Sequence, residues 1–156
     1  MIRLSVPGTL LYRDVVLRVV ASACRLIRCH PSVEQEAGHR PHVKDFDDEV
    51  VSAAGEAFNN VAIHAYGART LGTAELEIEL QHDQITIRLS DVGTGFDPDA
   101  ELPPDLKTLP ESHMGLLIVR SFMDEVTYRR GSPPAIPNVM ILRKRYFTSD
   151  IAETAD

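Results

Sequence analysis

The sequence predicts an α+β fold with two layers, in which helices precede most of the strands. Before residue 66, apolar residues recur every three or four positions, which is the period of a helix that buries one face. From residue 74 onwards, apolar and polar residues alternate in short runs, which is the period of a half-buried strand. A strand, two helices and then a run of antiparallel strands are typical of a two-layer sandwich.

Length and composition fit a single domain. The chain has 156 residues, of which 44% are hydrophobic and 25% are charged, as in an ordinary globular protein with a substantial core. The sequence contains no internal repeat and no stretch that marks a domain boundary. We therefore expect one domain over residues 1–147 and a short polar tail over residues 148–156.

Charge and hydropathy exclude several classes of protein. The net charge of −7 argues against a general nucleic-acid binder and against a binder of anionic membranes. No run approaches the roughly 18 apolar residues of a membrane span, and the first residues do not resemble a signal peptide. Cys24 and Cys29 have neither a CxxC spacing nor a metal-ligand spacing, so we expect reduced thiols in a cytoplasmic protein.

The first 42 residues predict a strand, a helix and a loop. Residues 2–6 alternate and end at Pro7-Gly8, which predicts a short strand. Residues 10–28 have the spacing of an amphipathic helix. Residues 31–42 contain two prolines, a glycine and several charges, which predicts a loop.

A second helix is predicted over residues 44–66, with acidic residues near its start and Gly67 as its C-cap. One side of this helix is apolar and carries Val50, Val51, Ala54, Ala57, Phe58, Val61 and Ala65. Beside it, Glu56, Asn60 and His64 are four residues apart and would form a polar stripe over roughly 12 Å. Taken alone, such a stripe is more often a solvated helix edge than a site.

The remaining elements are a hairpin, a long loop, a helix and two strands. Residues 74–80 and 85–89 alternate and predict a β-hairpin around His82-Asp83-Gln84. Residues 92–112 contain four prolines and no periodicity, which is typical of a disordered segment or a functional lid. Residues 114–123 predict a short helix, and 126–128 and 138–145 predict the last two strands.

Two glycine-containing boxes flank this long loop. Asp91-Val92-Gly93-Thr94-Gly95-Phe96 follows a predicted strand, and Ser112-His113-Met114-Gly115-Leu116 opens a predicted helix. Glycine admits a positive φ or lets the backbone approach a ligand closely, and free amides at a helix start favour an anion. Either box alone is a weak signal, because Asp-x-Gly-x-Gly also occurs in hairpin turns.

The order of the three motifs is more specific. A helix with Glu56, Asn60 and His64, then the Asp91 box, then a lid and the Gly115 helix, resembles the histidine-kinase-like ATPases of the Bergerat fold. The narrower resemblance is to the bacterial anti-sigma-factor serine/threonine kinases, through Glu-x-x-x-Asn-x-x-x-His-Ala-Tyr and through residues 122–126, Phe-Met-Asp-Glu-Val. It covers the chain from the first strand to about residue 145. It implies a mixed, mostly antiparallel sheet with helices on one face.

The resemblance also implies roles for single residues. Asn60 would give its side-chain oxygen to Mg²⁺, which prefers oxygen ligands, and Asp91 would accept a hydrogen bond from the adenine amino group. Glu56 would be the general base for an incoming hydroxyl. The structural alternatives are a helix-surface amide, a turn-forming aspartate and a glutamate that only organises Mg²⁺ or water. His64 is interpreted as structural.

The two boxes would complete the ATP site. Gly93 and Gly95 would pack under the base beside Phe96, and Gly115 would bring helix amides to the phosphates between Met114 and Leu116. The second box departs from the usual Gly-x-Gly, because His113 occupies the first glycine position and can either crowd the phosphates or donate to them. Lys107 is the only cation of the predicted lid. Nucleotide binding is thus a firmer expectation than kinase activity.

The resemblance implies a regulatory kinase. Such a protein would sequester a sigma factor, phosphorylate a STAS-domain anti-anti-sigma partner with Mg·ATP, and form a homodimer through its sheet region. One alternative is a non-catalytic regulator that uses nucleotide only to set its shape for a partner. Another is a detached histidine-kinase catalytic domain, which the absence of a preceding phosphoacceptor helix pair disfavours.

Overall fold

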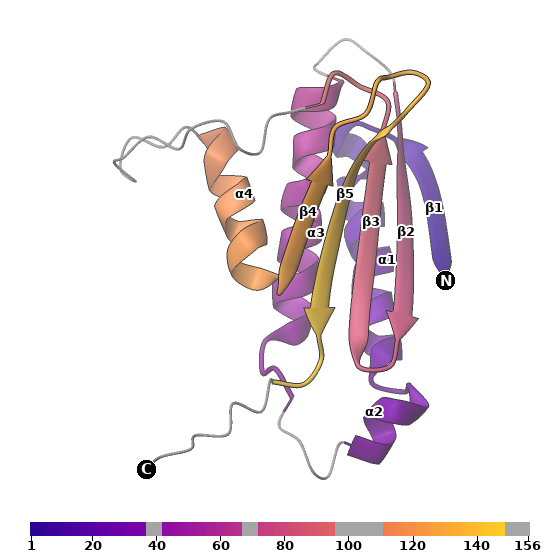
Figure 1. Ribbon diagram of the computed structural model, residues 1–156, viewed down its shortest axis with the longest axis vertical. Helices are drawn as coiled ribbons and strands as arrows, with labels where there is room; N and C mark the ends of the chain where they lie inside the picture. Colours follow the sequence, from indigo (N-terminus) through magenta and orange to yellow (C-terminus); the bar gives the residue numbers. More distant parts are fainter. Residues whose placement is uncertain (37–41, 67–71, 96–110, 149–156) are drawn as a thin grey trace.

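Five strands form one sheet in the order β1-β2-β3-β5-β4, and helices cover one of its faces (Figure 1). The computed structural model describes residues 1–36, 42–66, 72–95 and 111–148. The strands are β1 (Ile2–Pro7), β2 (Thr73–Gln81), β3 (Gln84–Asp91), β4 (Glu125–Arg129) and β5 (Asn138–Arg145). The helices are α1 (Arg13–Ile27), α2 (Pro31–Glu36), α3 (Phe46–Asn60) and α4 (Glu111–Phe122). A 3-10 turn (Leu10–Tyr12) precedes α1, and a π-helical turn (Val61–Ala65) continues α3.

The sheet has one apolar face and one charged face, as the alternation in the sequence predicts. All four pairings among the described strands are antiparallel, whereas a mixed sheet was expected. Ile78 on β2 pairs with Ile87 on β3, and Ile87 pairs with Leu142 on β5, so that one buried row crosses the centre of the sheet. On the opposite face, Arg3 contacts Glu77 at 2.9 Å. The predicted two-layer α+β class is confirmed.

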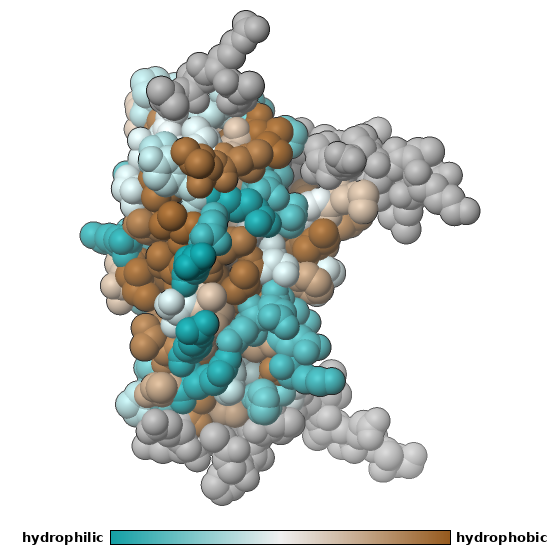
Figure 2. All heavy atoms as spheres, turned by 180° about the vertical axis from the view of Figure 1, so that it is seen from behind, coloured by the Kyte–Doolittle hydropathy of each residue, from teal (hydrophilic) through white to brown (hydrophobic). Residues whose placement is uncertain are grey.

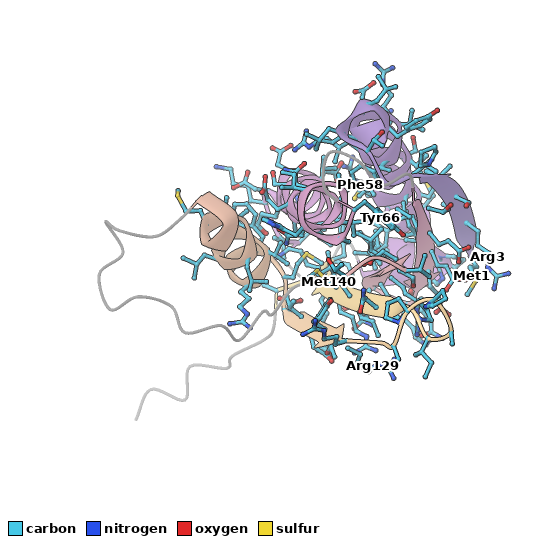
Figure 3. The ribbon with its side chains drawn as sticks, turned by 90° about the horizontal axis from the view of Figure 1, so that it is seen from above. Met1, Arg3, Phe58, Tyr66, Arg129 and Met140 are labelled. Atoms are coloured by element: carbon cyan, nitrogen blue, oxygen red, sulfur yellow. The ribbon has the colours of Figure 1, made fainter. Side chains whose placement is uncertain are left out.

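Helices α1 and α3 form the second layer, and α4 lies beside α3 near the β4 edge (Figure 3). The central helix α3 is the most buried, because it contacts α1, α4 and the sheet. Phe46, Val50 and Phe58 on α3 have an exposed fraction of 2% or less. Their burial holds α3 in place, and α3 carries the first predicted site motif.

The predicted loop over residues 31–42 is wrong in its first half, which forms α2. Pro31 stands at the first helical position, where its missing N–H and its fixed φ are no obstacle. Just before it, the ring Nδ1 of His30 lies 2.7 Å from the Ser32 hydroxyl oxygen and accepts a bond from the Ser32 N–H. Val33 is buried in the core, so tertiary packing also supports this turn. Residues 37–41 lie outside the described residues.

Other element boundaries differ by a few residues. The helix predicted over 10–28 begins as the 3-10 turn, and the helix predicted over 44–66 begins at Phe46 and becomes π-helical at Val61. Helix α4 begins three residues before its predicted start. The predicted C-cap Gly67 and most of the predicted lid, residues 96–110, lie outside the described residues. The division into residues 1–147 and 148–156 stays a prediction.

Both cysteines are free, but their surroundings differ. Cys24 is fully buried in the core and Cys29 is exposed at the end of α1. Burial raises the pKa of the Cys24 thiol to about 12, with a further contribution from the Asp47 carboxylate. The thiolate is the reactive form of cysteine, so Cys24 is protonated and inert at neutral pH. No helix within the described ranges is long and apolar enough to cross a membrane.

We expect a thiol-alkylating reagent at pH 8 to add one adduct to the folded protein, at Cys29, because a thiol whose pKa is raised stays neutral below that pKa. Intact-mass spectrometry after brief treatment with iodoacetamide measures this. In concentrated urea both thiols react, which is the control. Two adducts at equal rates in the folded protein would contradict the burial of Cys24.

Candidate functional site

The site begins at the carboxyl-terminal end of α3. Glu56 is half-buried and Asn60 is 5% exposed, whereas His64 is exposed. His64 therefore does not share the burial of the other two members of the predicted stripe. The Tyr66 N–H donates to the Val61 carbonyl at 3.3 Å, a bond that spans five residues instead of four. The helix thus ends in a π-helical turn, which the α-helical spacing of the sequence did not predict.

The end of α3 is pressed against the first glycine box. A Cβ at Gly93 would lie 2.2 Å from the Ala65 carbonyl oxygen, so only glycine fits here. That carbonyl accepts a hydrogen bond from the Thr94 N–H at 3.0 Å. The Thr94 hydroxyl donates to the His64 carbonyl at 3.1 Å. His64 therefore contributes backbone to the site, which agrees with its interpretation as structural.

Asp91 is buried at the end of β3 and is held by one of its two carboxylate oxygens. Its Oδ1 accepts hydrogen bonds from the Gly93 N–H and from the side-chain amide of Asn138, both at 2.9 Å. Both of these bonds end on Oδ1, so among the described residues Oδ2 is the oxygen left to accept a hydrogen bond from a ligand. A carboxylate oriented in this way suits recognition of an amino group.

Asn138 is a site residue that the sequence analysis missed. It is fully buried at the start of β5, and its amide nitrogen also donates to the Gly93 carbonyl at 3.0 Å. Its amide oxygen accepts a hydrogen bond from the Gly131 N–H at 3.0 Å. A polar residue at the start of the apolar run Val-Met-Ile-Leu was the available signal. A buried amide in such a place must be hydrogen-bonded, which indicates a specific partner.

Tyr66 joins the end of α3 to both neighbouring strands. Its hydroxyl donates to the Thr73 carbonyl at 2.7 Å and accepts from the Val92 N–H at 2.9 Å. Its ring lies between Gly8 and Gly72, where a Cβ would come within 2.4 and 1.8 Å of ring carbons. Burial raises the pKa of Tyr66, so the hydroxyl keeps the proton that it donates.

Gly95 ends the described part of the first box. Its φ is +72°, a left-handed conformation that favours glycine, and a Cβ there would lie 2.8 Å from the Tyr128 hydroxyl oxygen. The Arg130 side chain donates to the Thr94 carbonyl at 3.3 Å, which ties the box to the segment after β4. Phe96 lies outside the described residues.

The second glycine box brings α4 against Glu56. A Cβ at Gly115 would lie 2.7 Å from Glu56 Oε2, so the glycine permits the two helices to meet at this carboxylate. Met114 is exposed and Leu116 is buried. The free amides of a helix start belong to its first four residues, here 111–114, and Gly115 comes directly after them. His113 lies in this first turn, but its side chain is outside the described residues.

The other end of α4 is anchored to β5. The buried Lys144 ammonium donates to the Phe122 carbonyl at 2.5 Å and lies 2.7 Å from a Glu49 carboxylate oxygen of α3. The Asp124 carboxylate accepts a hydrogen bond from the Arg145 N–H at 2.7 Å. These bonds give residues 122–126, singled out in the sequence, a structural role: they fix where α4 ends.

One observation at Asn60 fits a bound ligand such as Mg·ATP. The amide nitrogen of Asn60 is buried with no hydrogen-bond partner among the described residues, which is costly unless a ligand orders this side chain. No cluster of three His, Cys, Asp or Glu side chains occurs in the described part of the chain. Mg²⁺ needs no such cage, because it binds through one or two protein oxygens and substrate phosphates.

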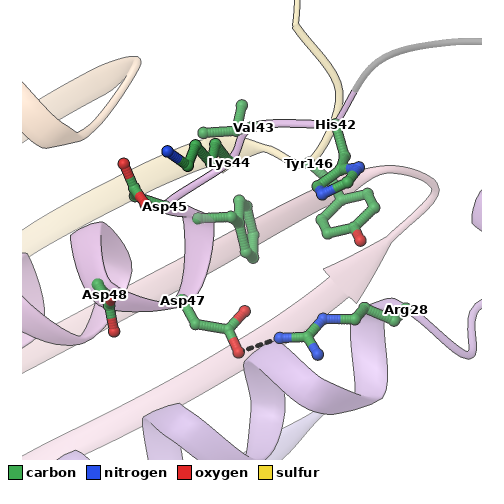
Figure 4. Close-up of a pocket in the computed structure, with 9 residues that line it drawn as sticks. Arg28, His42, Val43, Lys44, Asp45, Asp47, Asp48 and Tyr146 are labelled. Atoms are coloured by element: carbon green, nitrogen blue, oxygen red, sulfur yellow. Dashed lines mark hydrogen bonds and ion pairs between the residues drawn. The ribbon is translucent and has the colours of Figure 1, made fainter.

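A hollow of about 510 Å³ lies at the opposite end of α3 (Figure 4). The Arg28–Asp47 ion pair borders it, and His42 stacks on Tyr146 there. It contains none of the predicted site residues, so it is separate from the site.

Tyr66→Phe should lower the free energy of unfolding by about 1–3 kcal/mol, because it removes two hydrogen bonds of roughly 0.5–1.5 kcal/mol each, to the Thr73 carbonyl and from the Val92 N–H, while the ring still fills its place. Urea unfolding followed by circular dichroism measures this. Tyr12→Phe, at the start of α1, is the matched control. An unchanged unfolding midpoint for Tyr66→Phe would show that the two hydrogen bonds of the Tyr66 hydroxyl contribute nothing to stability.

Comparisons with known proteins agree with this geometry. The family model described as "Histidine kinase-like ATPase domain" matches residues 7–143. The anti-sigma F factor of Clostridium beijerinckii is 31% identical over 112 residues, which cover 68% of this chain and 75% of that protein. The serine-protein kinase RsbW of Staphylococcus epidermidis is 33% identical over 109 residues, covering 64% and 68%.

Among solved structures, the mycobacterial sensor histidine kinase MprB aligns with a TM-score of 0.49 at 13% identity, over 94% of this chain and 99% of that chain. The family assignment depends on the family model and the sequence relatives, not on this structural similarity. The resemblance predicted from three ordered motifs is confirmed. The chain belongs to the histidine kinase-like ATPase domain family.

Proposed function

We propose that this protein is an anti-sigma factor and an ATP-dependent protein-serine/threonine kinase. It sequesters a sigma factor in the cytoplasm and phosphorylates a STAS-domain anti-anti-sigma partner. The names of two relatives, an anti-sigma F factor and a serine-protein kinase, support the class of activity. The observation that carries the proposal is the position of the half-buried Glu56 carboxylate. It lies against Gly115 of α4, and Glu56 itself lies one helical turn before the buried Asn60 on α3.

ATP binds between the end of α3, the end of β3 and the start of α4. The adenine amino group donates to Asp91 Oδ2, and Gly93 and Gly95 lie under the base; Phe96 is assigned to the same site from the sequence motif alone. The phosphates lie at the free amides of the first turn of α4, beside His113 and Met114. Leu116, the buried residue after Gly115, fixes the helix that carries this turn.

Asn60 would hold Mg²⁺ through its side-chain oxygen, and its buried, unpaired amide nitrogen is free to donate to a phosphate oxygen. When bound, Mg²⁺ would supply positive charge to stabilise the transferred phosphoryl group. Glu56 lies one turn earlier on the same helix, so its carboxylate is close to where the metal and the phosphates meet. Glu56 is therefore the residue placed to receive a proton from the substrate hydroxyl.

The transfer balances with these groups alone. The partner's serine or threonine oxygen forms a bond to the γ-phosphorus while the bond from that phosphorus to the oxygen of ADP breaks. The hydroxyl proton passes to the Glu56 carboxylate, which orients the hydroxyl and makes it a better nucleophile. ADP then leaves with the bridging oxygen.

A second candidate function is a regulator that binds nucleotide and partner without phosphate transfer. His113 in place of a glycine is the observation that favours it, because the family's motif has no side chain at this position. In both cases partner binding needs an exposed surface. The helix layer carries apolar side chains on its outer face, and Leu10, Leu11 and Val15 are exposed there (Figure 2).

A homodimer through the sheet belongs to the same proposal. No helix among the described residues covers the outer face of the sheet, and ion pairs such as Arg3–Glu77 and Arg143–Glu125 run across it. A face with both charge signs in rows can complement a second copy of itself. Sedimentation equilibrium distinguishes this dimer from a monomer.

The kinase assay combines the protein with Mg²⁺, γ-labelled ATP and its STAS partner. We expect label on a serine or threonine of the partner from wild type, and a loss of at least about hundredfold in Glu56→Gln, because an amide cannot accept the proton. ATP affinity, measured by calorimetry, should remain within about twofold, since Asp91 and Asn60 are intact.

Asp48→Asn, which changes an exposed carboxylate in the first turn of the same helix α3, is the matched control and should keep wild-type activity. ATP binding without transfer by wild type would exclude the kinase and leave the non-catalytic regulator. Full activity in Glu56→Gln would exclude Glu56 as the base.

A further inference from the structure

A glycine in the middle of α3 has no role in the site described so far. Gly55 is buried at a position where glycine costs about 1 kcal/mol relative to alanine. A Cβ there would lie 2.8 Å from an Arg13 guanidinium nitrogen and 3.2 Å from Leu17 Cδ2, both on α1. The glycine, which directly precedes Glu56 in the sequence, therefore makes room for the Arg13 side chain to lie across α3.

Two successive hydrogen bonds connect Arg13 to Glu56. Its Nε donates to Asn59 Oδ1 at 2.9 Å. Asn59 Nδ2 in turn donates to Glu56 Oε1 at 3.3 Å. The other carboxylate oxygen, Oε2, is the one that lies against Gly115. The two carboxylate oxygens are thus bounded by different partners.

The direction of this chain follows from the chemistry of its members. A guanidinium can only donate hydrogen bonds, so Arg13 selects the oxygen end of the Asn59 amide. That choice turns the amide nitrogen, which only donates, towards the carboxylate. Without Arg13, both orientations of the amide would be available, and one of them would place an oxygen against the Glu56 oxygen.

We propose that Arg13 and Asn59 are positioning residues that hold the Glu56 carboxylate in the orientation needed to accept the substrate proton. The inference rests on the proposed function, because it assumes that Glu56 is the base. A base must be held closely to its geometry, since small displacements of a reacting group reduce rates strongly. Arg13 also makes α1 part of the catalytic arrangement, although α1 carries none of the three family motifs.

Two variants test the chain with little loss of volume. Arg13→Met keeps the aliphatic stem over Gly55 and removes the donor. Asn59→Leu keeps the approximate shape of the side chain and removes both of its hydrogen bonds. Arg18→Met, on the same helix and paired with the exposed Asp14, is the matched control. Arg13→Lys restores a donor at this position.

We expect kcat for phosphate transfer to fall about tenfold in Arg13→Met and in Asn59→Leu, with the Kd for Mg·ATP within about twofold of wild type. Arg18→Met should match wild type, and Arg13→Lys should recover part of kcat. The double variant Arg13→Met/Asn59→Leu should be no slower than Asn59→Leu, because Arg13 acts only through Asn59. A purely structural role would give additive losses and lower thermal stability.

A readout without activity accompanies the kinetics. The side-chain amide resonance of Asn59 in a ¹H–¹⁵N spectrum should move in Arg13→Met and in Glu56→Gln, and not in Arg18→Met. Wild-type kcat in Arg13→Met and Asn59→Leu, with Glu56→Gln inactive, would overturn the positioning role and leave the base assignment intact. Full activity of Glu56→Gln would instead exclude Glu56 as the base, and a wild type that binds ATP without transferring phosphate would overturn the proposed function. An Asn59 resonance insensitive to Arg13→Met would overturn the hydrogen-bond chain itself.

Discussion

The close approach of Gly93 to the Ala65 carbonyl is the contact on which the rest of the site depends. It joins the end of the central helix to the end of a central strand through backbone atoms, with 2.2 Å between the Ala65 oxygen and a Cβ that glycine lacks. The Thr94 N–H satisfies the same carbonyl. Asn60 precedes Ala65 and Asp91 precedes Gly93, so this seam between the end of α3 and the first glycine box sets the relative position of Asn60 and Asp91.

The polar groups at this seam follow one rule, with one exception. Asp91, Asn138 and Tyr66 are buried, and each has specific hydrogen-bond partners, as a buried polar group must. Their network holds together the side of the site that we propose for the adenine. The exception is the Asn60 amide, which is buried without a partner among the described residues. A protein retains such a group where a ligand completes it.

The opposite wall of the site is built differently. Helix α4 is anchored at its carboxyl-terminal end by Lys144 and Asp124, whereas its first turn follows residues 96–110. Gly115 lets this helix reach Glu56. Asn59 of α3 donates a hydrogen bond to the same carboxylate, and Arg13 of α1 donates to Asn59. The proposed base thus lies where three helices meet.

Much of this arrangement follows from local patterns in the sequence. Alternation in residues 74–80 and 85–89 predicts the central hairpin, because each strand buries only one face. The order of the motifs predicts which ends of α3, β3 and α4 form the site. The hairpin prediction depends on neighbours within a few residues. The site prediction depends on a family resemblance that extends to about residue 145.

Three features depended on contacts between distant residues and were not predicted. Helix α2 begins at a proline and is supported by Val33 in the core, which composition alone does not reveal. The π-helical turn after Asn60 meets Gly93 from another element, which helical spacing alone does not reveal. The partners of Asn138 and Asn59 lie 47 and 46 residues away, on Asp91 and Arg13.

The most direct test of the account is a crystal structure of the protein with Mg²⁺ and a non-hydrolysable ATP analogue. It should show the adenine amino group on Asp91 Oδ2, Mg²⁺ on the side-chain oxygen of Asn60, and the γ-phosphate on the side of the site that faces Glu56. A nucleotide bound elsewhere, or a metal held without Asn60, would contradict the assignment of this seam as the ATP site.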